Sequence, residues 1–179
     1  MTNHGLDAAR DRDLHLVPLD ALCDQLVAGP HAGARAAILA LRDLGAPVEL
    51  GDDATARIRA ALEDLDTLLD AHLRKAEHLV FPAVSALADA ERRGGGRPPS
   101  AFSTLLHPIR VLEAEHVQLG GALRRLDRSI AAVTGDLRTT SWWTAMRRAA
   151  DDFAAALSHE VRIESLVLFP RALDLDRRL

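Results

Sequence analysis

The chain has 179 residues, of which 48% are hydrophobic and 27% are charged, and its formal net charge at pH 7 is -4. This composition is typical of one globular domain and gives no reason to expect binding to nucleic acid or to a membrane. The single Cys23 excludes an internal disulfide. Since no charged leader precedes an apolar run and no stretch is long enough to span a bilayer, we expect a cytoplasmic protein.

The first half of the chain predicts two long helices. Residues 1–17 lack an apolar period, and we expect them to form a flexible amino-terminal extension. The first helix is expected over residues 18–44, with a kink or restart at Gly29-Pro30, because proline disrupts a helix interior. Residues 45–53 form a predicted turn, and the second helix should run from there to about Ala90.

The second half of the chain predicts two more helices. Residues 92–100, "RRGGGRPPS", are typical of a linker. A third helix is expected over 108–133, and Ser141 is a candidate cap for a fourth helix that ends near Arg171. Four helices with short connections predict an all-α, antiparallel up-down four-helix bundle, which we assign to residues 18–179.

Two stretches near the ends of the second and fourth helices resemble each other. "HLRKAEHLVFPAV" (72–84) and "EVRIESLVLFPRAL" (160–173) align on Phe-Pro, so that Phe81 matches Phe169. The alignment places His72 against Glu160 and Ala76 against Glu164. The polar positions therefore differ between the copies although the apolar positions are kept.

Each predicted helix carries a polar residue of a metal-ligating type within its apolar stripe. Residues three or four positions apart share one helix face. The apolar face of the first helix is formed by Val27, Ala34 and Ile38, and that of the second by Leu65, Leu69, Ala76 and Leu79. The third helix has Ile109, Leu112, Leu119 and Leu123 on this face, and the fourth has Phe153, Ala156, Leu157 and Val167. Five polar side chains interrupt these stripes: His31, His72, His116, Glu160 and Glu164.

The inward carboxylates decide between a structural and a functional interpretation. A single histidine on an apolar face is more often a hydrogen-bonded core residue than a ligand. Burying Glu160 and Glu164 together, however, is costly unless arginine, protons or a metal ion neutralise them. Because three inward histidines accompany the two carboxylates, we favour a metal ion, and facing helices with imidazole and carboxylate ligands are typical of non-heme iron sites.

Three segments carry a resemblance to a known family. "HLRKAEHLVFP" (72–82), "PIRVLEAEH" (108–116) and "EVRIESLVLFPRAL" (160–173) resemble the hemerythrin-like (HHE cation-binding) domain, and most closely its branch associated with repair of iron centres. The resemblance covers roughly residues 20–175. It implies a four-helix bundle with a diiron centre, bridged by two glutamates, that handles dioxygen, peroxide or nitric oxide.

The resemblance is incomplete at the ligand positions. His31, His72, His116 and Glu164 occupy motif positions, whereas Ala76 stands where a bridging glutamate is expected and Glu160 where a histidine is expected. A second family histidine near the end of the first helix has no counterpart. Glu77 and His159 have the expected residue types but are displaced by one position, about 100° around a helix. We therefore predict the five inward residues as ligands, with Glu77 and His159 as further candidates.

The predicted ligand set supports two classes of function. Three histidines and two glutamates suffice for one or two non-heme iron ions, and the additional carboxylate favours oxidised iron with free coordination positions. The first class is a non-heme iron protein, expected to be diiron, that reacts with dioxygen, peroxide or nitric oxide, and an oxidase or oxygenase acting on a small molecule is one form of it. The alternative is a non-catalytic protein that binds iron or nitric oxide, senses them or repairs iron centres, or a bundle whose site has decayed. A homodimer stays open in both classes.

Overall fold

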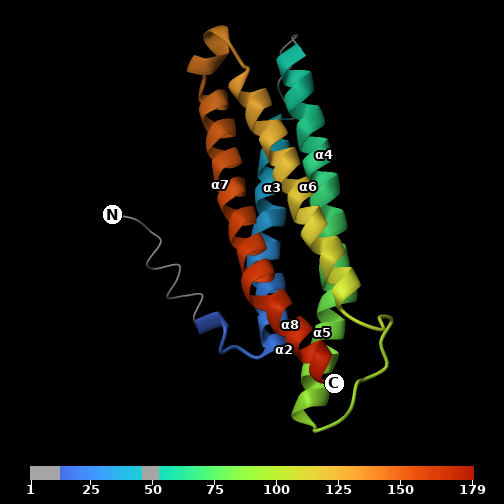
Figure 1. Ribbon diagram of the computed structural model, residues 1–179. Coiled ribbons are helices and arrows are strands. Elements are labelled where there is room, and N and C mark those ends of the chain that lie inside the picture. The colour runs from blue at the N-terminus through green and yellow to red at the C-terminus, as the bar shows by residue number, and fades with distance from the viewer. Residues whose placement is uncertain (1–12, 46–52) are drawn as a thin grey trace.

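The computed structural model describes residues 13–45 and 53–179, and all regular structure within those ranges is helical (Figure 1). Four long helical columns lie side by side and alternate in direction along the chain, as Figure 1 shows. The first column consists of α2 (Leu19–Leu26), η1 (Val27–His31) and α3 (Ala32–Gly45), and the second of α4 (Asp53–Lys75), η2 (Ala76–Val80) and α5 (Phe81–Arg92). The third column is the single helix α6 (Leu106–Ala131). The fourth consists of α7 (Ser141–Ile163), η4 (Glu164–Leu168) and α8 (Phe169–Arg178). The predicted all-α four-helix bundle is confirmed.

Three of these columns contain a π-helical turn, counted over the described residues, and each such turn is associated with a proline. Pro30 lies inside η1, whereas Pro82 and Pro170 follow η2 and η4 by two residues. A proline lacks the backbone N–H and its ring clashes with the carbonyl four residues earlier. A wider π turn gives that clash room without ending the helix. The kink expected at Gly29-Pro30 is thus a π turn in a continuous helical column.

The π turns change which side chains face the core. Leu79 and Val27 were expected in the apolar stripes, yet their side chains are 51% and 36% exposed. Their neighbours Val80 and Leu26 are buried instead, with 2% and 1% exposure. A π turn holds more residues than an α turn, so an assignment that continues the 3.6-residue period through it is shifted by one position. Both stripe assignments were wrong for this reason.

The helix boundaries differ from the expected ones in the second half of the chain. The fourth column continues to Arg178 rather than ending near Arg171, because Asp176 near its end is held by other parts of the chain. Asp176 accepts hydrogen bonds from Arg97, from the Thr104 hydroxyl at 2.7 Å and from the backbone N–H of Leu105 at 3.0 Å. These bonds attach α8 to the segment that precedes α6. The fourth helix is capped by Thr140, whose hydroxyl accepts from the N–H of Trp143, and not by Ser141.

Two predicted segments fall largely outside the described part of the chain. These are residues 1–12 of the expected amino-terminal extension and residues 46–52 of the expected turn. Farther along the extension, the carbonyls of Leu14 and Val17 accept hydrogen bonds from Arg171 at 2.9 and 2.6 Å. None of the described helices is both long and apolar enough to cross a membrane.

The hydrophobic core consists of two clusters separated by a polar layer. One cluster contains Leu26, Ala76, Leu112 and Ile163 at its boundary with that layer. The boundary of the other cluster is formed by Ala34, Leu73, Leu119 and Leu157. Between these boundaries each column contributes at least one histidine or glutamate. The fold therefore places a polar layer across the bundle, closed at both ends by apolar packing.

Candidate metal centre

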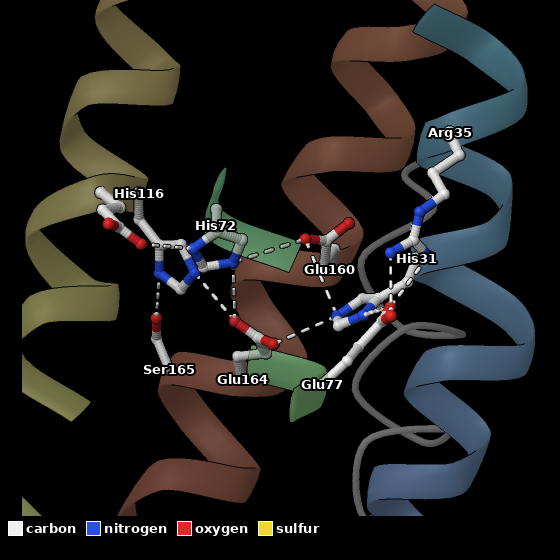
Figure 2. Close-up of polar contacts among 9 residues, drawn as sticks. His31, Arg35, His72, Glu77, His116, Glu160, Glu164 and Ser165 are labelled. Carbon is white, nitrogen blue, oxygen red and sulfur yellow. Dashed lines mark hydrogen bonds and ion pairs between the residues drawn. The ribbon is translucent and has the colours of Figure 1, made fainter. Parts of the chain in front are cut away.

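Five polar side chains from all four columns meet in the layer between the two cores (Figure 2). They are the five residues expected there from the sequence: His31, His72, His116, Glu160 and Glu164. Four of the side chains have 0% exposure and His116 has 9%. Their ligand roles stay a prediction, but their convergence in the interior is a feature of the structure.

Glu164 lies at the centre of the cluster and faces all three imidazoles. Its Oε2 lies 2.9 Å from Nε2 of His116 and 3.5 Å from Nε2 of His72, whereas its Oε1 lies 3.3 Å from Nε2 of His31. In Figure 2 the rings of His72 and His116 lie on one side of the carboxylate and that of His31 on the other. Burial alone would raise the pKa of Glu164, but hydrogen bonds with His116 and His31 and the charge of the nearby His72 outweigh it and hold the pKa well below its usual range.

Glu160 lies one helical turn before Glu164 and has no such stabilisation. Its Oε1 is 3.7 Å from Nε2 of His72 and 3.9 Å from Nε2 of His31, beyond hydrogen-bond distance. Both of its oxygens, and Nε2 of His72, are buried without a hydrogen-bond partner among the described residues. Burial raises the pKa of Glu160 to about 7. Orphaned polar atoms of this kind are rare in folded proteins, and a bound cation or proton would satisfy them.

Each histidine is oriented by a second polar group at its other ring nitrogen. Nδ1–H of His31 donates to Glu77 at 2.8 Å, and Nδ1–H of His72 donates to Glu115 at 3.3 Å. Nδ1 of His116 lies 3.2 Å from the hydroxyl of Ser165. Such outer partners fix the tautomer and the ring orientation of metal-binding histidines.

Basic side chains in turn hold the two outer carboxylates. Arg35 donates to both oxygens of Glu77 at 2.8 Å, and Lys75 donates to Glu115. Each outer carboxylate therefore has its own cation. The charges of Glu160 and Glu164 are left to be neutralised within the layer itself.

The two Phe-Pro blocks supply aromatic support for the imidazoles. Phe81 stacks on His31 with ring centroids 5.4 Å apart, and Phe169 stacks on His116 at 6.0 Å. Each phenylalanine follows a π turn and reaches a histidine on a different column. The repeated sequence thus encodes a repeated local structure, a π turn followed by a phenylalanine that supports one ring of the polar layer.

The hydrogen-bonding pattern leaves a position for protons or a metal ion in this layer. Because a carboxylate only accepts, Glu77 and Glu115 fix the ring protons of His31 and His72 on Nδ1. Neutral rings of this tautomer present Nε2 lone pairs toward the carboxylates of Glu160 and Glu164, so acceptors face acceptors. Either protons or a metal ion must lie between them. The nearby carboxylates also raise the pKa values of His31 and His72, although burial opposes this.

The donor set fits a transition-metal ion. His72, His116 and Glu164 each offer one ligand atom, and these three atoms lie within 4.8 Å of one another. Two imidazoles and one carboxylate are the donor set of non-heme iron sites that keep free coordination positions. A metal ion bound here would supply Lewis acidity and, for iron, a redox couple. Glu160 and His31 lie beside this group of three and could complete or extend it.

The two less certain ligand candidates lie outside the cluster. The Glu77 carboxylate points to Nδ1 of His31 and to Arg35, so it supports the layer from outside (Figure 2). His159 is exposed, and its Nδ1 accepts from Arg162 at 3.1 Å. Ala76 is buried with 0% exposure, as a residue at the inward position should be. The π turn that begins at Ala76 does not bring the Glu77 carboxylate into the interior.

The sequence did not reveal the outer partners Arg35, Lys75, Glu115 and Ser165. Glu115 and Ser165 directly neighbour His116 and Glu164, and this adjacency is the available signal. It is a weak one, because Glu115 supports His72, which lies 43 residues earlier on another column. The pairing depends on how α4 and α6 pack.

A helical bundle with a buried layer of histidine and carboxylate defines the class of bundle proteins that bind a metal ion between facing helices. The family model of the hemerythrin HHE cation binding domain matches residues 24–172. The chain therefore belongs to the hemerythrin HHE cation-binding family. Membership of this family supports non-heme iron as the bound cation.

Similar proteins carry a name connected with iron. The chain is 30% identical over 177 residues to the iron-sulfur cluster repair protein YtfE of Edwardsiella ictaluri, an alignment that covers 94% of this chain and 73% of the relative. It is also 30% identical over 105 residues to the proteins of the same name from Escherichia coli O1:K1 and Escherichia fergusonii. These alignments cover 59% of this chain, which spans 42% of the length of either relative.

Proposed function

We propose that the protein holds non-heme iron in the polar layer, reacts there with dioxygen, peroxide or nitric oxide, and serves the supply or repair of iron centres. Its ligands in this proposal are His31, His72, His116, Glu160 and Glu164. Relatives named for iron-sulfur cluster repair support the biological role. The observation that carries the proposal is the unequal division of donors on the two sides of Glu164.

One side of Glu164 offers a much better metal position than the other. Two imidazoles, those of His72 and His116, face Oε2, whereas His31 alone faces Oε1. Glu160 lies between the sides, 3.7 Å from His72 and 3.9 Å from His31. Ala76 contributes no donor where the family resemblance expects a bridging carboxylate. A first iron should therefore bind tightly beside His72 and His116, and a second should bind weakly beside His31.

A weakly bound iron ion is what a protein that transfers iron to an acceptor needs. Repair of an iron centre requires an ion that leaves its carrier when an acceptor is present. The chain provides the conditions for this: outer carboxylates keep Nε2 of His31 and His72 free to bind, and apolar clusters on both sides limit access of water. On its side of Glu164, His31 is the single imidazole, whereas His72 and His116 share the other side, so the ion beside His31 has fewer donors.

An anaerobic titration with Fe(II) against a competing chelator tests the proposal. The unaltered protein should show one tight and one weaker equivalent. His116→Ala should remove the tight equivalent, whereas His31→Ala should remove the weaker one and leave the tight one. His78→Ala is the matched control, because His78 is exposed and lies outside the layer. Two equivalents of equal affinity, or equal losses in both layer variants, would contradict the asymmetry, and no binding at all would indicate a decayed site.

An oxidase or oxygenase acting on a small molecule is the second candidate. The observation that favours it is Glu160, a carboxylate at a position where the resemblance expects histidine, since hard oxygen donors suit the more oxidised metal. Oxygen consumption by the Fe(II)-loaded protein, with and without an added reductant, separates the two. Sustained consumption over many turnovers would favour the oxidase, and a single stoichiometric uptake would favour iron handling.

A further inference from the structure

A cavity with apolar walls lies between α2, η1 and α7, outside the polar layer. Its volume is about 340 Å³. Its walls are formed by Leu14, Leu22, Leu26, Pro30 and Ile163. Leu22, Leu26 and Ile163 are themselves buried, with exposures of 1%, 1% and 5%. These three wall residues therefore belong to the packed core, whereas Leu14 and Pro30 are half-buried at the edge of the cavity.

Three residues that line the cavity are direct chain neighbours of residues in the polar layer. Pro30, His159 and Ile163 line it, and the residues that follow them in the chain are His31, Glu160 and Glu164. Since η1 and α7 pack against each other, these residues belong to one wall with the cavity on one side and the layer on the other. A molecule in the cavity would lie next to the segments that hold the layer together.

The rim of the cavity is polar but has no strong preference for either charge. Asp13, Gln25 and His159 line the cavity and are exposed, so they lie at its open side. Asp13 repels an anion and attracts a cation, and the guanidinium of Arg162, which donates to Nδ1 of His159 at 3.1 Å, does the reverse. The rim therefore selects neither charge, but the apolar walls disfavour both, because a charged group placed against them would lose its hydration. Asp13 and Gln25 can both accept a hydrogen bond from a ligand.

We propose that this cavity binds a small uncharged molecule that consists of an apolar ring and a single hydrogen-bonding group. The ring lies against Leu22, Leu26 and Ile163, and the polar group lies at the rim beside Asp13 and Gln25. A concave, mostly apolar cavity with a few polar groups at one side is the usual form of a small-molecule site. A volume at the lower end of the range for such sites limits the ligand to one smaller than a typical drug.

The proposal goes beyond iron binding and does not depend on it. Its lining residues exclude all five predicted ligands, so the cavity should bind its molecule whether or not iron is present. If the molecule is a substrate or an effector of the layer, the connection runs through the wall formed by η1 and α7. Failure of the iron titration would leave the cavity proposal intact, and the reverse also holds.

Calorimetric titration of the full chain with indole tests the proposal. Indole has an apolar ring system and one N–H donor, and indole-3-acetate is the charged control. Gln25→Trp should fill the rim and weaken indole binding by about tenfold or more. Asp24→Trp is the matched control, because Asp24 is the exposed neighbour on the same helix and does not line the cavity. Circular dichroism of both variants confirms that they fold.

The expected result is saturable 1:1 binding of indole to the unaltered protein and to Asp24→Trp, with weaker binding to Gln25→Trp and weaker binding of indole-3-acetate. Three results would overturn the proposal. The first is the absence of saturable binding to the unaltered protein. The second is an equal loss in both tryptophan variants. The third is equal affinity for indole and indole-3-acetate, which would mean that the apolar walls do not disfavour a charged ligand.

Discussion

Nδ1–H of His31 donates a hydrogen bond of 2.8 Å to Glu77, whose carboxylate also receives two hydrogen bonds from Arg35. The preceding residue, Ala76, is buried where the family resemblance expects a bridging glutamate. The carboxylate next to Ala76 therefore supports a histidine from outside the layer. Burial would raise the pKa of Glu77, but Arg35 and His31 outweigh it and lower that pKa, so the support is charged at neutral pH.

Removing the charge of Glu77 should weaken iron binding from outside the layer. In Glu77→Gln the amide no longer holds the Nδ1 proton of His31 as strongly, and loss of such an outer partner costs roughly ten- to a hundredfold in metal affinity. The weaker iron equivalent should be affected, because it depends on His31. Chelator competition measures the change, and Glu63→Gln, at an exposed position of α4, is the control. An unchanged affinity would mean that Glu77 only pairs with Arg35.

Restoring a carboxylate at the inward position should strengthen the weak metal position. Ala76→Glu adds a donor where Ala76 is fully buried, and iron bound per chain should rise toward two equivalents. Without metal the same change buries a further carboxyl group and should lower the free energy of unfolding by about 2–4 kcal/mol. Metal analysis and thermal unfolding with and without iron check both effects. An unchanged iron count with an unchanged spectrum would show that position 76 does not reach the metal.

Glu160 should affect the metal-free and the iron-loaded protein in opposite directions. Glu160→Gln removes a buried carboxylate whose oxygens have no hydrogen-bond partner within the described structure, so the metal-free protein should gain about 1 kcal/mol of stability. Its iron affinity should fall, because a neutral amide is a poorer donor. Glu160→His should keep iron and give a site closer to the family pattern, with more stable oxygen adducts. Effects within about 0.5 kcal/mol and an unchanged spectrum for both variants would exclude Glu160 as a ligand.

Asp176 should make the stability of the bundle depend on pH. Burial raises its pKa, but hydrogen bonds from Thr104, the N–H of Leu105 and Arg97 outweigh this and lower the pKa below the usual 3.8. The folded state then binds the proton less readily than the unfolded state, so the stabilisation is complete well above pH 3.8 and is lost as pH falls through the lower folded value.

The corresponding measurement compares Asp176→Asn with the unaltered protein by denaturant unfolding. At pH 7 the variant should be less stable by about 2 kcal/mol, since it leaves Arg97 without its charged partner. The difference should shrink as the pH approaches 3. Asp174→Asn on the same helix is the control, because the Asp174 side chain is 59% exposed. A difference that stays constant between pH 7 and pH 3 would assign the effect to packing and not to the charge.

The residue spacing alone determined the four helices and the five inward side chains. His72 and His116 fall among leucines three and four positions apart, and Glu160 and Glu164 fall one turn apart after Phe153 and Leu157. Helical period is a local property of the chain, so the direction of these side chains can be predicted from the neighbours on the same helix. The family motif at the Phe-Pro blocks pointed to the same positions.

The prediction of inward side chains from the helical period was wrong where a π turn accompanies a proline. Leu79 and Val27 were assigned to the core, and the π turns of η2 and η1 bury Val80 and Leu26 instead. The sequence shows the prolines, but it does not show whether a helix will end, bend or widen at each of them. Packing of the neighbouring columns decides this, because it sets which side chain meets the core.

Only the tertiary structure decided how the polar layer is held in place. Glu77 supports His31 over a separation of 46 residues, and Glu115 supports His72 over 43. Periodicity places each of these glutamates on a helix face but not against a particular histidine, because that contact depends on the spacing and the angle between two helices. The sequence therefore determined which groups enter the interior, and the packing of the columns determined which ring nitrogen is left facing Glu160 and Glu164.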